Sequence, residues 1–177
     1  GYDAPPLDLG GRGDLLVVGD RALAGEGAEE DVGPRLGGSE YLAQFGGSDR
    51  YPGLPERPAA LVGTIATVAD RETTLATHDV SHGGLAVTLA EMVHDDAGAD
   101  LSLPSPAHLF HEQPGRVVVE TTDPAGVREV FEGVAPVVDL GTADDSGSLS
   151  LSVDRTELSV DAATVAEWRE TIERALE

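Results

Sequence analysis

Two segments, residues 36–42 and 78–85, place a Gly-Gly pair and a nearby serine where a helix is expected to begin. Glycine allows tight turns and close approach to a ligand, and the first N–H groups of a helix have no partner within it. Such helix starts can bind anions, with about 0.3–1 kcal/mol contributed by the helix dipole. Alternatively, both serines are ordinary N-caps and the glycines only permit the turns. The residues predicted to contact a phosphate are Gly37, Gly38, Ser39, Ser81, Gly83 and Gly84.

Two charged side chains could extend this chemistry. Asp79 stands where a strand is expected to meet the second Gly-Gly pair, and it could hold Mg²⁺ beside a phosphate because Mg²⁺ takes oxygen ligands. It could instead close the turn by accepting hydrogen bonds from backbone N–H groups. Arg116 could bind a phosphate or a carboxylate, or it could pair with Glu112 across the intervening Pro-Gly turn.

The histidines do not form a recognisable metal or catalytic motif. His78 and His82 are four residues apart, but the zinc motif needs a glutamate after the first histidine and a continuous helix, and a Gly-Gly pair follows here. His108 and His111 are three apart in a proline-flanked segment, which is a weaker pattern still. Asp79, Ser81 and His82 are too close in sequence to form a catalytic triad without unusual geometry.

Composition narrows the class of partner. The 177 residues include 33 acidic and 11 basic groups, a net charge of −22, which argues against a nucleic-acid interface. No apolar run approaches the roughly 18 residues that a membrane span needs, so we expect no membrane partner. The absence of cysteine excludes disulfides, thiolate catalysis and cysteine-ligated zinc. No targeting segment is visible, which favours a cytoplasmic location.

All 11 basic residues are arginines, and lysine is absent. Abundant Asp and Glu without Lys is expected of a halophilic protein, because molar salt shortens the Debye length to about 3 Å and screens carboxylate repulsion. A GC-rich genome would explain the arginines but not the threefold acidic excess. We therefore interpret this acidic protein as adapted to high salt.

The hydrophobic pattern predicts one domain, residues 1–177, of alternating strands and helices. Residues 20–36 are expected to form a loop, and the last two strands are expected to flank an acidic hairpin loop. The fold class is therefore α/β or α+β with a mixed sheet. Strands are predicted at 14–19, 75–80, 99–103, 115–121, 136–140 and 148–153, and helices at 39–45, 59–73, 85–93, 123–133 and from Ser159 or Asp161 to Leu176.

The segments Gly-Gly-Ser-Glu-Tyr-Leu at 37–42 and His-Asp-Val-Ser-His-Gly-Gly-Leu at 78–85 closely resemble the C-terminal domain of phosphoribosylformylglycinamidine synthase, in its large synthetase subunit. Residues 13–19, 109–119 and 140–141 fit the same pattern in order, so the resemblance covers nearly the whole chain. The second segment alone is typical of a wider superfamily with aminoimidazole ribonucleotide synthase, selenophosphate synthetase and hydrogenase maturation proteins. The first segment favours the purine amidotransferase branch.

The resemblance implies a three-layer α/β/α fold with a mixed sheet. It also implies a role in an enzyme that uses ATP and Mg²⁺ to phosphorylate the amide oxygen of formylglycinamide ribonucleotide, after which ammonia from a glutaminase subunit displaces the phosphate. This chain resembles the last of several synthase domains, so we expect it to be inactive when isolated. The expected partners are the remaining synthase domains and the glutaminase subunit, with a homodimer as a further alternative.

Two departures from the family pattern weaken the assignment of the family's phosphate contacts to residues of this chain. His82 replaces the acidic or amide residue expected before the Gly-Gly pair, and His111 and Gln113 replace serines around Glu112. The working hypothesis is that the domain helps to close the nucleotide and substrate cleft of the synthase. The alternative is a structural or dimerisation module of the same superfamily that touches no ligand.

Overall fold

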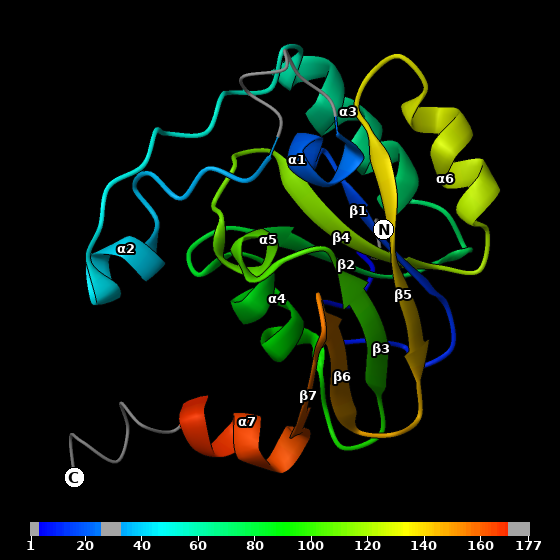
Figure 1. Cartoon of the computed structure of the whole chain (residues 1–177). Coiled ribbons are helices and arrows are strands. Elements are labelled where there is room, and N and C mark those ends of the chain that lie inside the picture. The colour runs from blue at the N-terminus through cyan, green and yellow to red at the C-terminus, as the bar shows by residue number, and fades with distance from the viewer. Residues whose placement is uncertain (1–3, 26–32, 170–177) are drawn as a thin grey trace, which may run out of the picture.

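The computed structural model describes residues 4–25 and 33–169 (Figure 1). Within these residues, one seven-stranded sheet has the strand order β2-β4-β1-β5-β3-β6-β7. All neighbouring strands are antiparallel except β3 and β6, which makes the sheet mixed. The strands are β1 (Asp14–Val18), β2 (Thr74–Val80), β3 (Gly98–Leu103), β4 (Arg116–Thr121), β5 (Val137–Asp144), β6 (Ser148–Val153) and β7 (Thr156–Asp161). The helices are α1 (Arg21–Ala24), α2 (Glu40–Phe45), α3 (Pro58–Ala69), α4 (Gly84–Met92), α5 (Pro106–Phe110), α6 (Pro124–Phe131) and α7 (Ala162–Arg169).

Helices cover both faces of the sheet, as strand β1 shows most clearly. Its side chains at Leu15 and Val17 belong to the larger core cluster, which includes residues of α4, α5 and α7. Those at Leu16 and Val18 belong to the smaller cluster with α3 and α6. A strand buried on both faces is a continuous apolar run, which is why this segment could be predicted as a strand. The expected three-layer α/β/α arrangement is confirmed (Figure 1).

The expectation that the strands around the acidic loop form a hairpin is wrong. Strand β3 lies between β5 and β6, pairing antiparallel with β5 and parallel with β6. The close pairing of β3 with β5 depends on Gly141, where a Cβ atom would lie 1.9 Å from the carbonyl oxygen of Asp100. The turn residues after β5 resemble a hairpin locally, but the pairing partner is a strand some forty residues earlier in the chain.

Three further elements differ from the sequence-based expectation. The segment predicted as a loop from residue 20 begins with the short helix α1, because the Asp20 carboxylate accepts a hydrogen bond of 2.9 Å from the Leu23 N–H. Helix α5 and the edge strand β7 were not predicted. Asp161 is the residue that caps α7, accepting from the Thr164 N–H at 2.7 Å, and the predicted end of that helix lies outside the described residues.

Candidate functional site

The two Gly-Gly helix starts are held together by one carboxylate, that of Glu112. Its Oε1 atom accepts a hydrogen bond of 2.7 Å from the Glu40 N–H at the start of α2 and one of 2.9 Å from the Gly83 N–H before α4. Carboxylates bind such helix starts because unpaired N–H groups and the helix dipole both favour negative charge. We call this arrangement the Glu112 junction.

Two other contacts reinforce the Glu112 junction. The Tyr41 ring of α2 packs on Phe110 of α5 with ring centroids 5.0 Å apart, and on Phe45 at 4.9 Å. His82, one of the residues that depart from the family pattern, places its Nδ1 atom 3.8 Å from the Glu40 carboxylate. Helix α2 is thus attached to the rest of the fold by an aromatic cluster and by polar contacts to both sides of the junction.

Two glycines of the junction are required by close backbone packing. Gly84 has φ +65°, and a Cβ atom there would lie 2.5 Å from the Leu109 carbonyl oxygen. A Cβ atom at Gly37 would lie 2.4 Å from the Arg50 carbonyl oxygen, which itself accepts a hydrogen bond of 3.1 Å from the Gly37 N–H. These two glycines therefore bring chain segments together, and both are buried.

The candidate residues divide into inward and outward groups. Ser39 is buried and caps α2, since its hydroxyl accepts a hydrogen bond of 3.3 Å from the Leu42 N–H. Gly38, Asp79 and Ser81 are exposed, and Gly83 is half-buried. The structure thus brings the two Gly-Gly segments together and leaves Gly38, Asp79, Ser81 and Gly83 accessible at the junction.

Asp79 does not belong to a group of three potential metal ligands among the described residues. Its side chain is 72% exposed, and its Oδ1 atom lies 3.9 Å from Nδ1 of the His78 ring. Among residues 4–25 and 33–169, no group of three His, Asp or Glu side chains is placed to hold a metal ion. Within the described residues, Asp79 could therefore supply one ligand to Mg²⁺, which takes one or two carboxylates together with phosphate oxygens and water.

Arg116 points into the protein and pairs with Asp20 instead of Glu112. It is 1% exposed, its Nη1 donates to the Asp20 carboxylate at 2.9 Å, and its Nε donates to the Gln113 carbonyl at 3.1 Å. His111 donates from Nε2 to the same Asp20 oxygen at 3.0 Å. This Asp20–His111–Arg116 cluster contains His111, which departs from the family pattern, and Arg116, which matches it. The cluster places the Arg116 guanidinium away from the accessible side of the junction.

The Asp20–His111–Arg116 cluster controls the ionisation of its carboxyl group. Burial acts to raise the pKa of Asp20, but the hydrogen bond from His111 and the charges of His111 and Arg116 outweigh it and lower the pKa from 3.8 to about 2. Burial also lowers the pKa of Arg116, against the opposing effect of Asp20. The guanidinium remains charged at neutral pH because the ordinary pKa of arginine is so high.

A stability change at low pH follows from this depressed pKa. Asp20 stabilises the folded chain above pH 3.8, and we expect about 2 kcal/mol of that stability to be lost as the pH falls through about 2. Urea unfolding at successive pH values, compared with an Asp20→Asn variant that cannot ionise there, measures the difference. Parallel pH profiles for the two proteins would contradict the assigned ionisation.

Sequence reasoning missed two other buried acidic roles. Asp20 follows a buried strand and precedes Arg-Ala-Leu-Ala, and an aspartate in this position is a recognisable N-cap signal. Glu120 of β4 is fully buried, and its carboxylate accepts hydrogen bonds from the N–H groups of Gly10, Arg12 and Gly13. No local signal at Glu120 identifies this role, because its partners lie more than 100 residues earlier in the chain.

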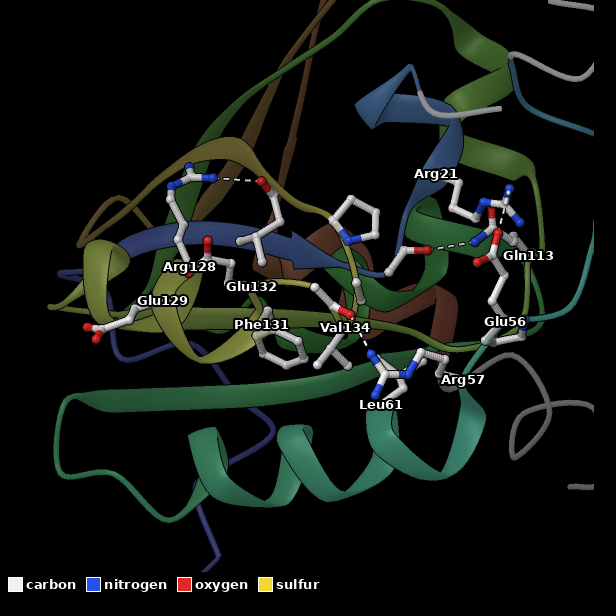
Figure 2. A pocket seen from close by; sticks show the side chains of 16 residues that line it. Arg21, Glu56, Arg57, Leu61, Gln113, Arg128, Glu129, Phe131, Glu132 and Val134 are labelled. Carbon is white, nitrogen blue, oxygen red and sulfur yellow. Dashed lines mark hydrogen bonds and ion pairs between the residues drawn. The ribbon is translucent and has the colours of Figure 1, made fainter. Parts of the chain in front are cut away.

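A cavity of about 920 Å³ lies beside the cluster, on the face of the sheet covered by α3 and α6 (Figure 2). Apolar side chains of Leu61, Phe131 and Val134 form part of its lining. Arg57 spans one side, where its Nη1 donates to the Gly133 carbonyl at 2.7 Å. None of the eight candidate site residues lines this cavity, neither the six predicted to contact a phosphate nor Asp79 and Arg116.

A mixed sheet between two helical layers, with two glycine-rich helix starts joined at one edge, defines a three-layer α/β/α domain with a polar loop junction. Residues 12–154 match the family model of the AIR synthase related protein, C-terminal domain, so the chain belongs to this family.

No described helix is long and apolar enough to cross a membrane.

Curated relatives support the same family. The chain is 57% identical to phosphoribosylformylglycinamidine synthase subunit PurL of Haloarcula marismortui, over 99% of this chain and 25% of that protein. It is 56% identical to the subunit of the same name from Natronomonas pharaonis, over 100% of this chain and 24% of that protein. The chain therefore spans about a quarter of the length of the curated relatives it matches.

Solved structures share the fold. A structure of Thermotoga maritima PurL complexed with ATP matches with a TM-score of 0.60 and 13% identity, over 92% of this chain and 27% of that chain. Escherichia coli HypE, a hydrogenase maturation protein, matches with a TM-score of 0.54 and 16% identity, over 90% of this chain and 52% of that chain. At these identities the likeness shows the fold alone.

Proposed function

We propose that this chain is the C-terminal domain of an ATP-dependent phosphoribosylformylglycinamidine synthase, and that it helps to form the nucleotide and substrate cleft. The observation that carries the proposal is the 57% identity to a PurL subunit over 99% of the chain. The reaction converts formylglycinamide ribonucleotide to its amidine in purine biosynthesis, with ammonia derived from glutamine. The whole enzyme is a C–N ligase, and this domain alone is inactive.

The part proposed for this domain is positional. The Glu112 junction fixes two loops, and its accessible groups (Gly38, Asp79, Ser81 and Gly83) face the cleft or the adjoining synthase domain. The exposed Ser81 hydroxyl is suited to phosphate, which accepts hydrogen bonds from such donors, whereas the Glu40 and Gly83 N–H groups already donate to Glu112. Buried Gly37, Ser39, Gly84 and Arg116 support the loops from behind.

ATP and Mg²⁺ belong to the complete synthase in this proposal. Support for the nucleotide comes from relatives of the same fold solved with ATP, ADP and AMPPCP. ATP would activate the substrate amide by phosphorylation, and the residues of this chain would restrict water and position one wall of the cleft. Because no group of three described His, Asp or Glu side chains is placed to hold a metal ion, the other ligands of Mg²⁺ are proposed to lie in the remaining synthase domains.

The proposed partners are the remaining synthase domains and a glutaminase subunit, in a cytoplasmic assembly. Support comes from a solved Thermotoga maritima assembly described as PurLQS, which this chain matches with a TM-score of 0.63. A homodimer is proposed as the alternative assembly.

The test is an assay of the full-length protein that carries these residues, supplied with its glutaminase subunit. We expect amidine formation from formylglycinamide ribonucleotide to require ATP and either glutamine or ammonia, and the 177-residue chain alone to show none. A folded full-length protein that forms no amidine with ammonia as the nitrogen source would reject the proposed reaction.

Two observations support the proposal that the protein is adapted to high salt. Its net charge is −22, and its relatives include the subunit of the haloarchaeon Haloarcula marismortui. We expect the chain to lose stability below about 0.5 M salt, where carboxylate repulsion is less screened. Thermal unfolding in dilute buffer and in about 2 M KCl measures this. An unchanged melting temperature would oppose the adaptation.

A further inference from the structure

Helix α3 (Pro58–Ala69), the longest helix that the structure describes, contains no ionisable residue. It lies beside α6 on one face of the sheet, and its buried residues Leu61 and Val68 pack into the smaller core cluster (Figure 1). The residues on its opposite side stand three or four apart, at helical spacing, and all are exposed. We call the following five residues the α3 face: Ala59, Val62, Gly63, Ala66 and Thr67.

The α3 face is apolar although it is exposed. Its one polar side chain is that of Thr67, whose hydroxyl donates to the Gly63 carbonyl at 3.0 Å and so has a partner within the helix. Val62, its largest side chain, is 65% exposed. Apolar residues on all sides of a helix are typical of a helix that is buried all round. The sequence of α3 is therefore suited to burial on both sides, whereas the described residues bury one side.

The lack of charge on α3 contrasts with the rest of the chain. A quarter of the 177 residues are charged, and acidic residues outnumber basic ones threefold. Helix α6, in the same layer, exposes Glu129, and the exposed Glu132 directly follows that helix. Burial of a carboxylate without a partner is costly, and a surface without carboxylates can be covered by another protein surface at no such cost. The charge distribution therefore favours the α3 face as a contact surface.

The segment before α3 adds further exposed apolar side chains. Among the described residues, eight large hydrophobic side chains are exposed, and half of them lie within residues 45–62: Phe45, Tyr51, Leu54 and Val62. Single exposed hydrophobic residues are ordinary, but a concentration of them is typical of a surface that contacts another protein surface. The exposed apolar side chains are thus concentrated in one stretch of chain, which ends on the α3 face.

The size of the α3 face favours a tethered partner over a second copy of this chain. The twelve residues of α3 make a helix about 18 Å long and, with side chains, about 10 Å wide. A stable complex of separate chains buries roughly 800 Å² on each partner, several times the area of such a face. A domain joined covalently to this one needs a smaller contact, because the linker keeps its effective concentration high. The curated relatives are about four times as long as this chain, which leaves room for such domains.

We propose that the α3 face docks against an uncharged, apolar surface of an adjoining domain in the same synthase polypeptide. The proposal rests on the proposed function, which supplies the adjoining domains. In this contact Val62 packs against apolar side chains of the partner, and Gly63 allows close approach of the partner's backbone, since nothing lies within 4 Å of its Cβ position. The contact is separate from the Glu112 junction, whose hydrogen bonds involve no residue of the α3 face.

The test uses cysteine as a probe, because the chain contains none. Ala66→Cys places a thiol on the α3 face, and Ala125→Cys is the matched control on the exposed side of the charged helix α6. Mass spectrometry measures the rate of maleimide modification at each position, in the 177-residue chain and in the full-length synthase, both in KCl concentrated enough to keep them folded. We expect Ala66→Cys to react at least tenfold more slowly in the full-length protein than in the 177-residue chain, and Ala125→Cys to react equally in both.

An Ala66→Cys rate that is the same in both proteins would overturn the proposal. Slow modification of Ala66→Cys already in the 177-residue chain would also overturn it, because this chain would then cover the α3 face itself. Protection that disappears when the full-length protein is diluted would assign the face to a second copy instead. Circular dichroism verifies that both variants are folded. Modification requires no turnover, so an active synthase with an unprotected Ala66→Cys rejects this inference alone, and an inactive one with a protected thiol rejects the proposed function alone.

Discussion

Replacement of Asp20 by alanine is expected to lower the free energy of unfolding by about 3–5 kcal/mol, because it leaves the buried Arg116 charge without its carboxylate. The same substitution removes the hydrogen bond to His111 and the cap of α1. Urea unfolding at neutral pH in high salt measures the change. This is the largest single-residue effect that the structure predicts.

Asp161→Ala is the matched control for this substitution. Asp161 also caps a helix, but its side chain is exposed and pairs with no buried cation, so only the loss of a cap is expected. The double variant Asp20→Ala/Arg116→Met should be more stable than the sum of the single changes predicts, since it removes both buried charges. Equal losses for Asp20→Ala and Asp161→Ala would contradict the assigned ion pair.

Replacement of Gly84 by alanine is the second change with a large expected effect, about 3 kcal/mol of lost stability. The backbone there has φ +65°, and the new Cβ atom would lie 2.5 Å from the Leu109 carbonyl oxygen and 2.8 Å from that of His111. Both the left-handed conformation and the overlap contribute. Thermal and urea unfolding of the 177-residue chain measure the loss.

Gly63→Ala provides the contrasting case within a helix of the same protein. Nothing lies within 4 Å of a Cβ atom built at Gly63, which is exposed in α3. Alanine is the better helix former, so this variant should gain about 0.5–1 kcal/mol. A Gly84→Ala protein as stable as Gly63→Ala would show that the tight packing behind the junction is absent.

The elements that could be predicted are those whose signals are local. Strand β1 is a continuous apolar run, β4 is rich in valine, and α4 repeats leucine at helical spacing. Ser39 caps α2 as its position before Glu40 predicts. In each case the residues that determine the structure are neighbours in the sequence, so the order and type of most elements could be inferred.

What could not be predicted depends on residues far apart in the chain. The insertion of β3 between β5 and β6 follows from pairing that no local turn signal records. Glu112 binds the Glu40 N–H from 72 residues away, and Arg116 reaches Asp20 from 96 residues away. The sequence therefore suggests Arg116 as a ligand of phosphate or carboxylate, whereas in the structure its partner is the buried carboxylate of Asp20, near the start of the chain.

This distinction also changes the meaning of the Gly-Gly pairs. From the sequence they are two separate candidate anion sites, with the alternative that they only shape turns. In the structure a single internal carboxylate joins them, and buried Gly37 and Gly84 pack against carbonyl groups of neighbouring segments. Contact with phosphate therefore stays a prediction for the exposed residues Gly38, Asp79 and Ser81, while the N–H of the half-buried Gly83 donates to Glu112.

The central claim is that the Glu112 junction positions these loops for the reaction of the complete synthase. The most direct measurement is kcat/KM for ATP in the full-length protein carrying Glu112→Ala, with the exposed Glu157→Ala as its control. We expect at least a tenfold decrease for Glu112→Ala, about 1.4 kcal/mol or more of transition-state stabilisation, and no change for the control. Unaltered kcat/KM in a folded Glu112→Ala enzyme would contradict the claim.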